Sequence, residues 1–378
     1  MPKLLLMALL AVASQTQAQV PGVVIDHSPA ASGLYIGSPS LAILPGGDYV
    51  ASHDFFGPKS NEFKSARSLV FRSTDRGKTW AKIAEIDGAF WSTLFVHRDK
   101  LYLLGTNRHH GDIVIRRSTD GGETWSTPKD AKSGMLRATG ECHCAPMPVL
   151  EHAGRLWRAF EWRDPPIAWG VNYRSGMASI PVNADLLDAT NWKFTNFPPS
   201  DRAWNGGDMG AWLEGNAVVA PDGKLVNVLR VQTKSADEKA AIVRIADDGA
   251  TASFDPTRDF IDFPGAAKKF TIRFDPNTKT YWTLATILHE KYRALNPGSI
   301  RNTLALSSSK NLRDWSVKTV LLHHPDAKKH GFQYVDWRFD GDDIIAACRT
   351  AFDDGQGGAR NNPDANYLTF HRFADFRK

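Results

Sequence analysis

Histidine is the side chain best suited to proton transfer near neutral pH, and several histidines in this chain stand beside other polar groups. His53 lies between a serine and an aspartate, His109 and His110 are adjacent, and His143 lies between two cysteines. An imidazole in such a setting can act as a general acid or a general base. We therefore take these four histidines as the candidate catalytic residues, although a loop histidine can equally be a solvated or hydrogen-bonded structural residue.

A second group of residues has the side-chain types that bind sugars. Aromatic rings cover sugar faces, charged and amide groups bind hydroxyls, and arginine or lysine binds carboxylates. The expected substrate-binding residues are Trp212, Glu214, Asn216, Arg230, Lys269, Tyr334, Asp336 and Arg349. Arg230 and Arg349 could instead buttress loops, and the pattern alone does not decide between these roles.

The elements that must position these residues are indicated by two near-copies of one pattern, at 73–80 and 118–125. Both copies are Ser-x-Asp-x-Gly-x-x-Trp, and their tryptophans lie about 45 residues apart, roughly the length of one four-stranded propeller blade. The aspartate can accept backbone N–H groups, the glycine tolerates a positive φ, and the tryptophan can anchor the hairpin. This Asp-box resembles the repeat of the sialidase-like propellers and predicts an all-β fold.

Six repeated units follow along the chain, each an inner hairpin and an outer hairpin with Gly, Pro, Asn or Asp at the turns. The segment 308–315 keeps the Asp-box spacing but has Lys310 in place of the aspartate and Leu312 in place of the glycine. Residues 23–36 are left over and could add a closing strand to the last blade or form most of a further blade. We expect a single β-propeller domain over residues 19–378.

Blade topology predicts which face carries the site. In an antiparallel blade the first strand starts and the second strand ends at one face, whereas the Asp-box turn lies at the opposite face. The candidate histidines, arginines, carboxylates and aromatics all open or close inner hairpins. We therefore expect them to converge on the face opposite the Asp-boxes.

Several segments beyond the Asp-boxes carry a more specific resemblance, and they lie at 35–40, 47–54, 109–111, 212–216 and 330–337. Together they resemble secreted bacterial propeller enzymes that remove rhamnose linked α-1,4 to glucuronate, which are similar to rhamnosyl-glucuronate lyases and ulvan lyases. The resemblance extends from about residue 23 to the C-terminus. It implies an acidic polysaccharide substrate, seven blades and a catalytic histidine, for which His27 is a further candidate. Hydrolysis and β-elimination both fit such a site.

Two other functions remain open at this stage. Sialidases carry an Arg-Ile-Pro segment on the first blade, but the comparable stretch at 35–39 is Tyr-Ile-Gly-Ser-Pro and has no arginine. Their tyrosine nucleophile and its glutamate partner cannot be identified from the sequence, and no obvious carboxylate pair indicates an ordinary two-carboxylate glycosidase. A glycan-binding propeller without catalytic activity is the third possibility.

Composition and the N-terminus set the remaining expectations. Residues 1–18 have Lys3, an apolar run and a small-residue cleavage site after Ala18, which predicts a signal peptide and a periplasmic or secreted protein. The net charge of +5 suits an acidic ligand, and the absence of a Lys/Arg run argues against nucleic acid. Three cysteines do not make a disulfide scaffold. We expect a monomer with no cofactor, no metal and no membrane span.

Overall fold

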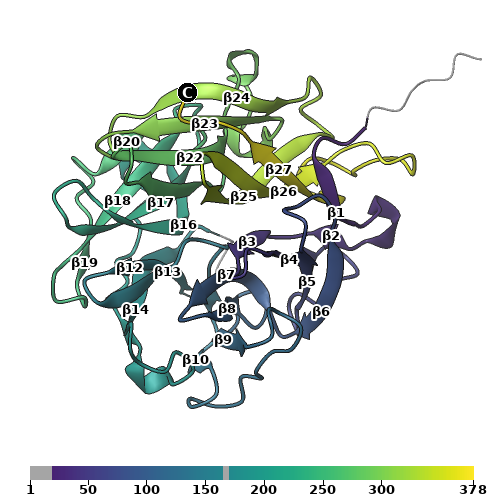
Figure 1. The fold of residues 1–378 in the computed structure, drawn as a ribbon. Coiled ribbons are helices and arrows are strands. Elements are labelled where there is room, and N and C mark those ends of the chain that lie inside the picture. The colour runs from purple at the N-terminus through teal and green to yellow at the C-terminus, as the bar shows by residue number, and fades with distance from the viewer. Residues whose placement is uncertain (1–18, 165–169) are drawn as a thin grey trace, which may run out of the picture.

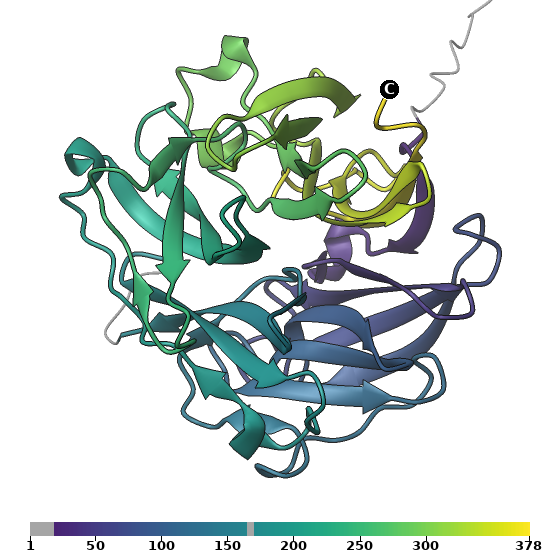
Figure 2. The ribbon, with the colours of Figure 1, turned by 60° about the vertical axis from the view of Figure 1, so that its left-hand side comes forward.

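Antiparallel sheets follow one another around a central axis as the blades of a propeller (Figure 1; Figure 2). The computed structural model describes residues 19–164 and 170–378, so the expected signal peptide at 1–18 lies outside the described residues. Within the described residues there are six sheets, each with four strands along its main path. This confirms the expected all-β propeller and the six repeated units.

The first three blades are built from residues 35–194. Blade 1 consists of β2 (Tyr35–Ile36), β3 (Ser40–Ile43), β4 (Tyr49–Phe56), β5 (Arg67–Ser73) and β6 (Ala81–Asp87). Blade 2 consists of β7 (Phe90–His97), β8 (Lys100–Thr106), β9 (Ile113–Ser118) and β10 (Met135–Arg137). Blade 3 consists of β11 (Cys142–His143), β12 (Leu150–His152), β13 (Arg155–Arg163), β14 (Tyr173–Pro181) and β15 (Lys193–Phe194).

The other three blades complete the ring. Blade 4 consists of β16 (Met209–Val219), β17 (Leu225–Thr233), β18 (Lys239–Ile245), β19 (Ala252–Ser253) and β20 (Phe260–Asp262). Blade 5 consists of β21 (Thr271–Asp275), β22 (Thr280–Thr286), β23 (Thr303–Ser309) and β24 (Ser316–His323). Blade 6 consists of β25 (Gly331–Asp340), β26 (Asp343–Ala351), β27 (Tyr367–Phe373) and β1 (Val23–His27). Short 3₁₀ turns lie at Ala30–Ser32, Ala189–Asn191, Asn205–Gly207, Glu290–Tyr292 and Pro297–Ser299.

The ring is closed by the N-terminal strand. Strand β1 pairs antiparallel with β27, with Val23 opposite Phe370 and His27 opposite Tyr367, and the two ends of the colour scale meet there in Figure 1. The segment 23–36 therefore supplies the closing strand of blade 6 and then β2 of blade 1. The seven blades implied by the family resemblance are wrong for this chain, because the leftover segment contains no further sheet.

The two Asp-boxes have the geometry that their residue types predict. Asp75 accepts hydrogen bonds from the backbone N–H of Thr79 at 2.9 Å and from its hydroxyl at 2.6 Å. The indole of Trp80 donates to the carbonyl of Gly77 at 3.3 Å. The corresponding turn at Asp120 repeats these contacts. Both turns connect the third strand of a blade to its outer edge and lie opposite the ends of the inner hairpins.

The innermost strands of blades 2, 4 and 6 share a β-bulge near the opposite face. Register shifts interrupt the pairing between Phe90 and Thr93 in β7, between Leu213 and Asn216 in β16, and between Gln333 and Asp336 in β25. Trp91, Glu214 and Tyr334 lie in these bulges with φ of 49°, 59° and 55°. Bulges re-aim side chains, and left-handed backbone at a non-glycine residue is characteristic of functional sites.

Candidate active site

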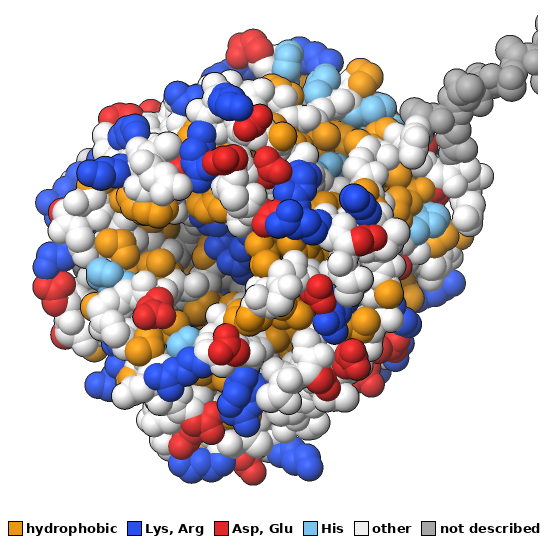
Figure 3. Space-filling model, in the orientation of Figure 1, with side chains coloured by type: hydrophobic (Ala, Val, Ile, Leu, Met, Phe, Trp, Pro, Cys, Tyr) orange, Lys and Arg blue, Asp and Glu red, His pale blue; other side chains and the backbone are white. Residues whose placement is uncertain are grey.

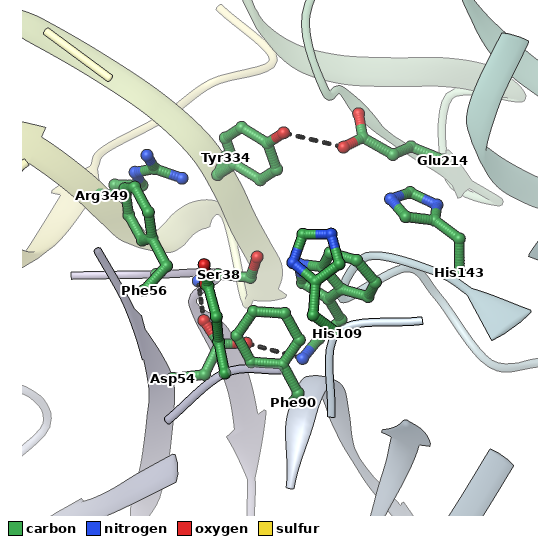
Figure 4. A pocket seen from close by; sticks show the side chains of 12 residues that line it. Ser38, Asp54, Phe56, Phe90, His109, His143, Glu214, Tyr334 and Arg349 are labelled. Atoms are coloured by element: carbon green, nitrogen blue, oxygen red, sulfur yellow. Dashed lines mark hydrogen bonds between the residues drawn. The ribbon is translucent and has the colours of Figure 1, made fainter. Parts of the chain in front are cut away.

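A pocket of about 240 Å³ opens where the three bulges meet the ends of blades 1, 3 and 6. Its walls combine aromatic rings with carboxyl, imidazole and guanidinium groups (Figure 4). The lining residues are Gly37, Ser38, Asp54, Phe56, Glu62, Phe90, Trp91, His109, His143, Glu214, Tyr334 and Arg349. Figure 3 shows one face of the propeller, in the orientation of Figure 1, whereas Figure 4 views the molecule from the opposite side, as the reversed order of the blades shows.

Tyr334 and Glu214 form the most tightly defined pair in the pocket. The phenol of Tyr334 donates to Oε1 of Glu214 at 2.8 Å (Figure 4). Nη1 of Arg230 donates to Oε2 of the same carboxylate at 2.8 Å and lies 3.4 Å from the phenol oxygen. Glu214 and Arg230 are each 2% exposed, so this ion pair is withdrawn from water.

The charges of this pair are fixed by their proximity. Burial alone would raise the pKa of Glu214, but the Arg230 guanidinium outweighs it and the pKa is lowered. Burial alone would lower the pKa of Arg230, but the Glu214 carboxylate outweighs it and the pKa is raised. The pKa of Tyr334 is raised by burial and by the adjacent carboxylate, which disfavours the phenolate. The resting site therefore holds a carboxylate, a guanidinium and a neutral phenol.

Two further arginines lie around the Tyr334 ring. The guanidinium carbon of Arg349 lies 5.0 Å from the ring centroid of Tyr334 and 4.4 Å from that of Phe56. The guanidinium carbon of Arg301 lies 5.8 Å from the Tyr334 ring. Burial lowers the pKa of Arg301 to about 10, so it stays charged at neutral pH. Three cations thus lie close to one phenol, with Glu214 as the carboxylate beside it.

Asp54 lies on the other side of the pocket, at the end of β4. Its Oδ1 accepts the backbone N–H of Ser38 at 2.8 Å, and its Oδ2 accepts that of Trp91 at 2.6 Å. A Cβ on Gly37 would lie 1.7 Å from Oδ1, so this close approach requires glycine. Despite these hydrogen bonds, burial raises the pKa of Asp54 to about 6.

Glu62 lies in the loop between β4 and β5 and is the second carboxyl group on this side. Burial raises its pKa to about 7, and the nearby Asp54 adds to the increase. Its side chain is partly exposed, whereas Asp54 is 2% exposed and locked by two N–H groups. Glu62 therefore has both the solvent access and the pKa expected of a general acid at neutral pH.

His143 is held by a buried carboxylate behind the pocket wall. Its Nδ1 lies 2.8 Å from Oε2 of Glu161, and Oε1 of Glu161 accepts the backbone N–H of Gly215 at 3.2 Å. The His143 ring packs against Trp91, with ring centroids 4.4 Å apart. This arrangement fixes the orientation of the ring and directs it at the pocket beside Glu214 (Figure 4).

His109 and His110 are brought to the same region but in different roles. His109 lines the pocket, and its ring stacks on Phe63 with centroids 4.6 Å apart. His110 lies behind the wall, where its Nε2 is 2.5 Å from the hydroxyl of Tyr173. Burial lowers the pKa of His109 to about 3 and that of His110 to about 2, so both rings are neutral at pH 7.

His53 points away from the pocket. It adjoins Asp54 on β4, and successive strand residues face opposite sides. Its Nδ1 donates to the carbonyl of Asp54 at 2.9 Å and its Nε2 lies 2.8 Å from Oδ2 of Asp26 on β1, so it connects blade 1 to blade 6. His27, on the same closing strand, has its Nε2 3.0 Å from Oδ2 of Asp354 and also lies outside the pocket wall.

Four of the expected substrate-binding residues make contacts between strands or blades instead of lining the pocket. The Trp212 indole donates to the Tyr173 carbonyl at 2.7 Å, and Oδ1 of Asn216 accepts the N–H of Ile272 at 2.9 Å. Nζ of Lys269 donates to the Val335 carbonyl at 2.7 Å. Asp336 accepts the hydroxyl of Ser40 at 2.9 Å, which connects blade 6 to blade 1.

The structure also brings in residues that the sequence did not single out. Asp54 and Glu62 carry the raised pKa values, Arg301 adds a cation, and Glu161 orients His143. Strand alternation is a sequence signal that could have distinguished Asp54 from His53, because two adjacent residues of a strand point to opposite faces and only one of them can point into the pocket. No sequence pattern predicts the position of Glu62. It depends on the conformation of the ten-residue loop between β4 and β5 (57–66).

The fold is that of known carbohydrate-active propellers. The structure is similar to an α-L-arabinanase of Penicillium chrysogenum, with a TM-score of 0.57, 14% identity and coverage of 94% of this chain and 98% of that one. It is similar to a Hadza microbial sialidase, with a TM-score of 0.63, 13% identity and coverage of 94% and 68%. An α-L-arabinofuranosidase of Fusarium graminearum gives a TM-score of 0.58, 11% identity and coverage of 93% and 97%. These likenesses define a six-bladed, sialidase-like propeller and no more.

No protein-family model matches the sequence, and the comparison with curated proteins also gives no match. Among the described residues, no helix is long and apolar enough to span a membrane. The three cysteines, Cys142, Cys144 and Cys348, are buried free thiols.

Proposed function

We propose that this protein is an exported glycosidase that removes the terminal sugar of an acidic glycan, with its propeller domain at 19–378 following a signal peptide at 1–18. The single observation that carries the proposal is that the Tyr334–Glu214 pair, with Arg230 hydrogen-bonded to Glu214, lines the same pocket as Glu62, whose pKa burial raises to about 7. A nucleophile and a general acid on opposite sides of a pocket are the two groups that retaining glycoside hydrolysis requires, and tyrosine is a known alternative nucleophile.

The reaction would proceed in two displacements. In the first, Oη of Tyr334 attacks the anomeric carbon, its proton passes to Oε1 of Glu214, and Glu62 protonates the departing glycosidic oxygen. In the second, Glu62, now ionised, takes a proton from water, which attacks the anomeric carbon. The bond to Tyr334 breaks and Glu214 returns the proton to the phenol. Arg230 stabilises the Glu214 carboxylate before the first transfer and after the second.

The charge balance of the pocket favours an acidic substrate. Arg349 lines the pocket and Arg301 lies near the Tyr334 ring, while Asp54 and Glu62 carry raised pKa values that reduce their negative charge near neutral pH. A uronate carboxylate can form a bidentate pair with a guanidinium. The family resemblance of the sequence supports rhamnose α-1,4-linked to glucuronate as the particular linkage.

A histidine-dependent reaction at the same linkage is the second candidate, and the buried His143–Glu161 pair favours it. A carboxylate at Nδ1 orients an imidazole so that its other nitrogen can exchange protons with a substrate. Such a histidine could activate water, or it could remove the C5 proton of glucuronate in a β-elimination after an arginine has neutralised the carboxylate.

The test is to incubate the protein with gum arabic, a sialoside and an arabinan oligosaccharide and to identify the sugar released. We expect rhamnose from gum arabic without the ultraviolet absorbance of an unsaturated uronate. Tyr334→Phe should reduce the rate by about 10³-fold, whereas His143→Gln should retain most of the activity. Sialic acid release would change the substrate but keep the mechanism.

Other outcomes would contradict the proposal. An unsaturated product together with an inactive His143→Gln variant would establish the histidine-dependent elimination. Retained binding of gum arabic oligosaccharides without release of any sugar from the three substrates would indicate a glycan-binding propeller. Far-ultraviolet circular dichroism of each variant would separate loss of chemistry from loss of fold.

A further inference from the structure

Among residues 19–164 and 170–378, Phe63 is the most exposed large hydrophobic side chain, at 65% of its full accessibility. It lies in the loop between β4 and β5, immediately after Glu62. A single exposed hydrophobic residue is ordinary at a protein surface, so exposure by itself assigns no role. What distinguishes Phe63 is how it is held and what it adjoins.

One face of the Phe63 ring is fixed by His109. The two ring centroids are 4.6 Å apart and the rings are inclined by 28°, which is a stacked arrangement. The same histidine donates its backbone N–H to the carbonyl of Glu62 at 2.7 Å, so a backbone hydrogen bond at Glu62 and ring stacking at Phe63 both hold the loop to His109. His109 in turn packs against Trp91, with centroids 4.6 Å apart. The ring is therefore supported from behind.

The His109 ring that supports Phe63 is also uncharged. Burial lowers the pKa of His109 to about 3, so Phe63 stacks on a neutral ring at pH 7. A neutral imidazole is less strongly hydrated than an imidazolium ion, so the ring behind Phe63 adds no charge to this edge of the pocket. The Phe63 ring itself remains largely exposed, between the pocket-lining residues Glu62 and His109 that hold it.

The position of Phe63 next to the general acid specifies what that face would contact. If Glu62 protonates the glycosidic oxygen, the leaving sugar must lie on the Glu62 side of the pocket. The negative π-face of an aromatic ring attracts the polarised C–H groups on a pyranose face. An exposed, rigid ring adjacent to the acid is thus placed where the leaving sugar passes.

We infer that Phe63 is a platform for the sugar on the leaving-group side of the cleaved bond, so that the enzyme recognises a pyranose beyond the terminal residue. This inference rests on the proposed function for the role of Glu62. It makes Phe63 a specificity-determining residue and leaves the bond-breaking steps to Tyr334, Glu214 and Glu62. It also predicts a preference for oligosaccharides over glycosides with a small leaving group.

The experiment compares Phe63→Ala with the wild type on two substrates, a gum arabic oligosaccharide and a rhamnosyl fluoride that has no leaving sugar. We expect kcat/KM for the oligosaccharide to fall by about tenfold and that for the fluoride to remain unchanged. Phe63→Tyr should restore most of the lost activity because it keeps the aromatic face. Phe274→Ala is the matched control, since Phe274 is 45% exposed, packs against the Tyr281 ring and lies outside this pocket.

A second measurement is independent of turnover. Saturation-transfer NMR on the Tyr334→Phe protein with the same oligosaccharides should show contact with the penultimate sugar that disappears in the Tyr334→Phe, Phe63→Ala double variant. Equal saturation in both proteins, or an equal loss of kcat/KM on both substrates, would overturn the platform. If the wild type cleaves neither substrate while the NMR contact depends on Phe63, the proposed function and the leaving-group role of Phe63 both fail, and Phe63 is a sugar contact of a binding site.

Discussion

The two sides of the pocket contain carboxyl groups whose pKa values are shifted in opposite directions. On one side Glu214 is fully buried, yet its pKa is lowered because Arg230 is 2.8 Å away. On the other side burial raises the pKa of Asp54 to about 6 and that of Glu62 to about 7. The degree of burial does not explain the difference, since Glu62 is the least buried of the three. The direction of the pKa shift is set by Arg230, the cation that is hydrogen-bonded to Glu214.

This difference assigns the two sides different chemistry. A carboxylate that stays ionised can accept the proton of Tyr334, and a carboxyl group whose pKa is raised to about 7 can donate a proton to a leaving oxygen and take one back. The same side chain type therefore acts as a base on the Arg230 side and as an acid on the Phe56 side. The predictions below disturb one side at a time.

The largest effect is expected from Glu214→Gln. The substitution removes the base for Tyr334 and leaves the Arg230 charge buried without its partner, which costs about 3–5 kcal/mol in folding free energy. We expect activity to fall by about 10³-fold, measured as kcat/KM on a substrate that the wild type cleaves, together with a lower urea midpoint. Glu214→Asp keeps the charge and serves as the control. A stable and fully active Glu214→Gln protein would remove this pair from the mechanism.

Glu62→Gln should have the next largest effect. The general acid must be protonated, so wild-type activity should decline as the pH rises through about 7, the pKa of Glu62. In the variant we expect a loss of about 10²-fold in kcat and no decline at that pH. The full pH–rate profile tests this. If the variant keeps the same alkaline decline, another group is the acid.

His109→Gln should change how stability depends on pH. The folded-state pKa of His109 is about 3, below its ordinary value of 6.5, so the unfolded chain binds the proton first as the pH falls. His109 therefore lowers stability progressively between about pH 6.5 and 3, and the variant should lose less stability across that window. Thermal melts at a series of pH values measure the two slopes. Parallel slopes would mean that His109 is not held neutral.

The smallest effect on catalysis is expected from Asp75→Ala. Asp75 bonds to Thr79 in an Asp-box turn far from the pocket, so the variant should melt at a lower temperature and keep its kcat. Hydrogen bonds from Thr79 lower the pKa of Asp75 to about 2, so the difference in melting temperature should vanish as the pH falls through that value. A reduced kcat in folded protein would mean that the two faces are coupled.

The sequence predicted the propeller because its signals are local. The Asp-boxes and the recurrent hairpin turns depend on residues close together in the chain, and so does the face on which the hairpins end. The site depends instead on β-bulges and on one loop. The residue types at Trp91, Glu214 and Tyr334 do not predict a left-handed backbone. Strand alternation places His53 and Asp54 on opposite faces of β4, and the position of Glu62 follows from tertiary contacts alone.

The altered Asp-box at 308–315 shows the same limit of prediction from residue types. Leu312 occupies the glycine position with φ of 65°, and the Trp315 indole still donates to its carbonyl at 2.9 Å. Oδ1 of Asn311 accepts the backbone N–H groups of Arg313 and Asp314, as the aspartate does in the intact boxes. The turn is retained although two of its defining residues have changed, because packing of Leu312 in the core compensates for the strained backbone.

The central claim, that one pocket keeps one glutamate ionised and another protonated, can be tested without a substrate. Carbon-13 NMR of the glutamate carboxyl groups across a pH titration measures each midpoint, with the Glu62→Gln protein identifying the Glu62 signal. We predict a midpoint near 7 for Glu62 and one below 4.5, the ordinary glutamate value, for Glu214. Midpoints for both residues near 4.5 would contradict the division of the pocket into a basic and an acidic side.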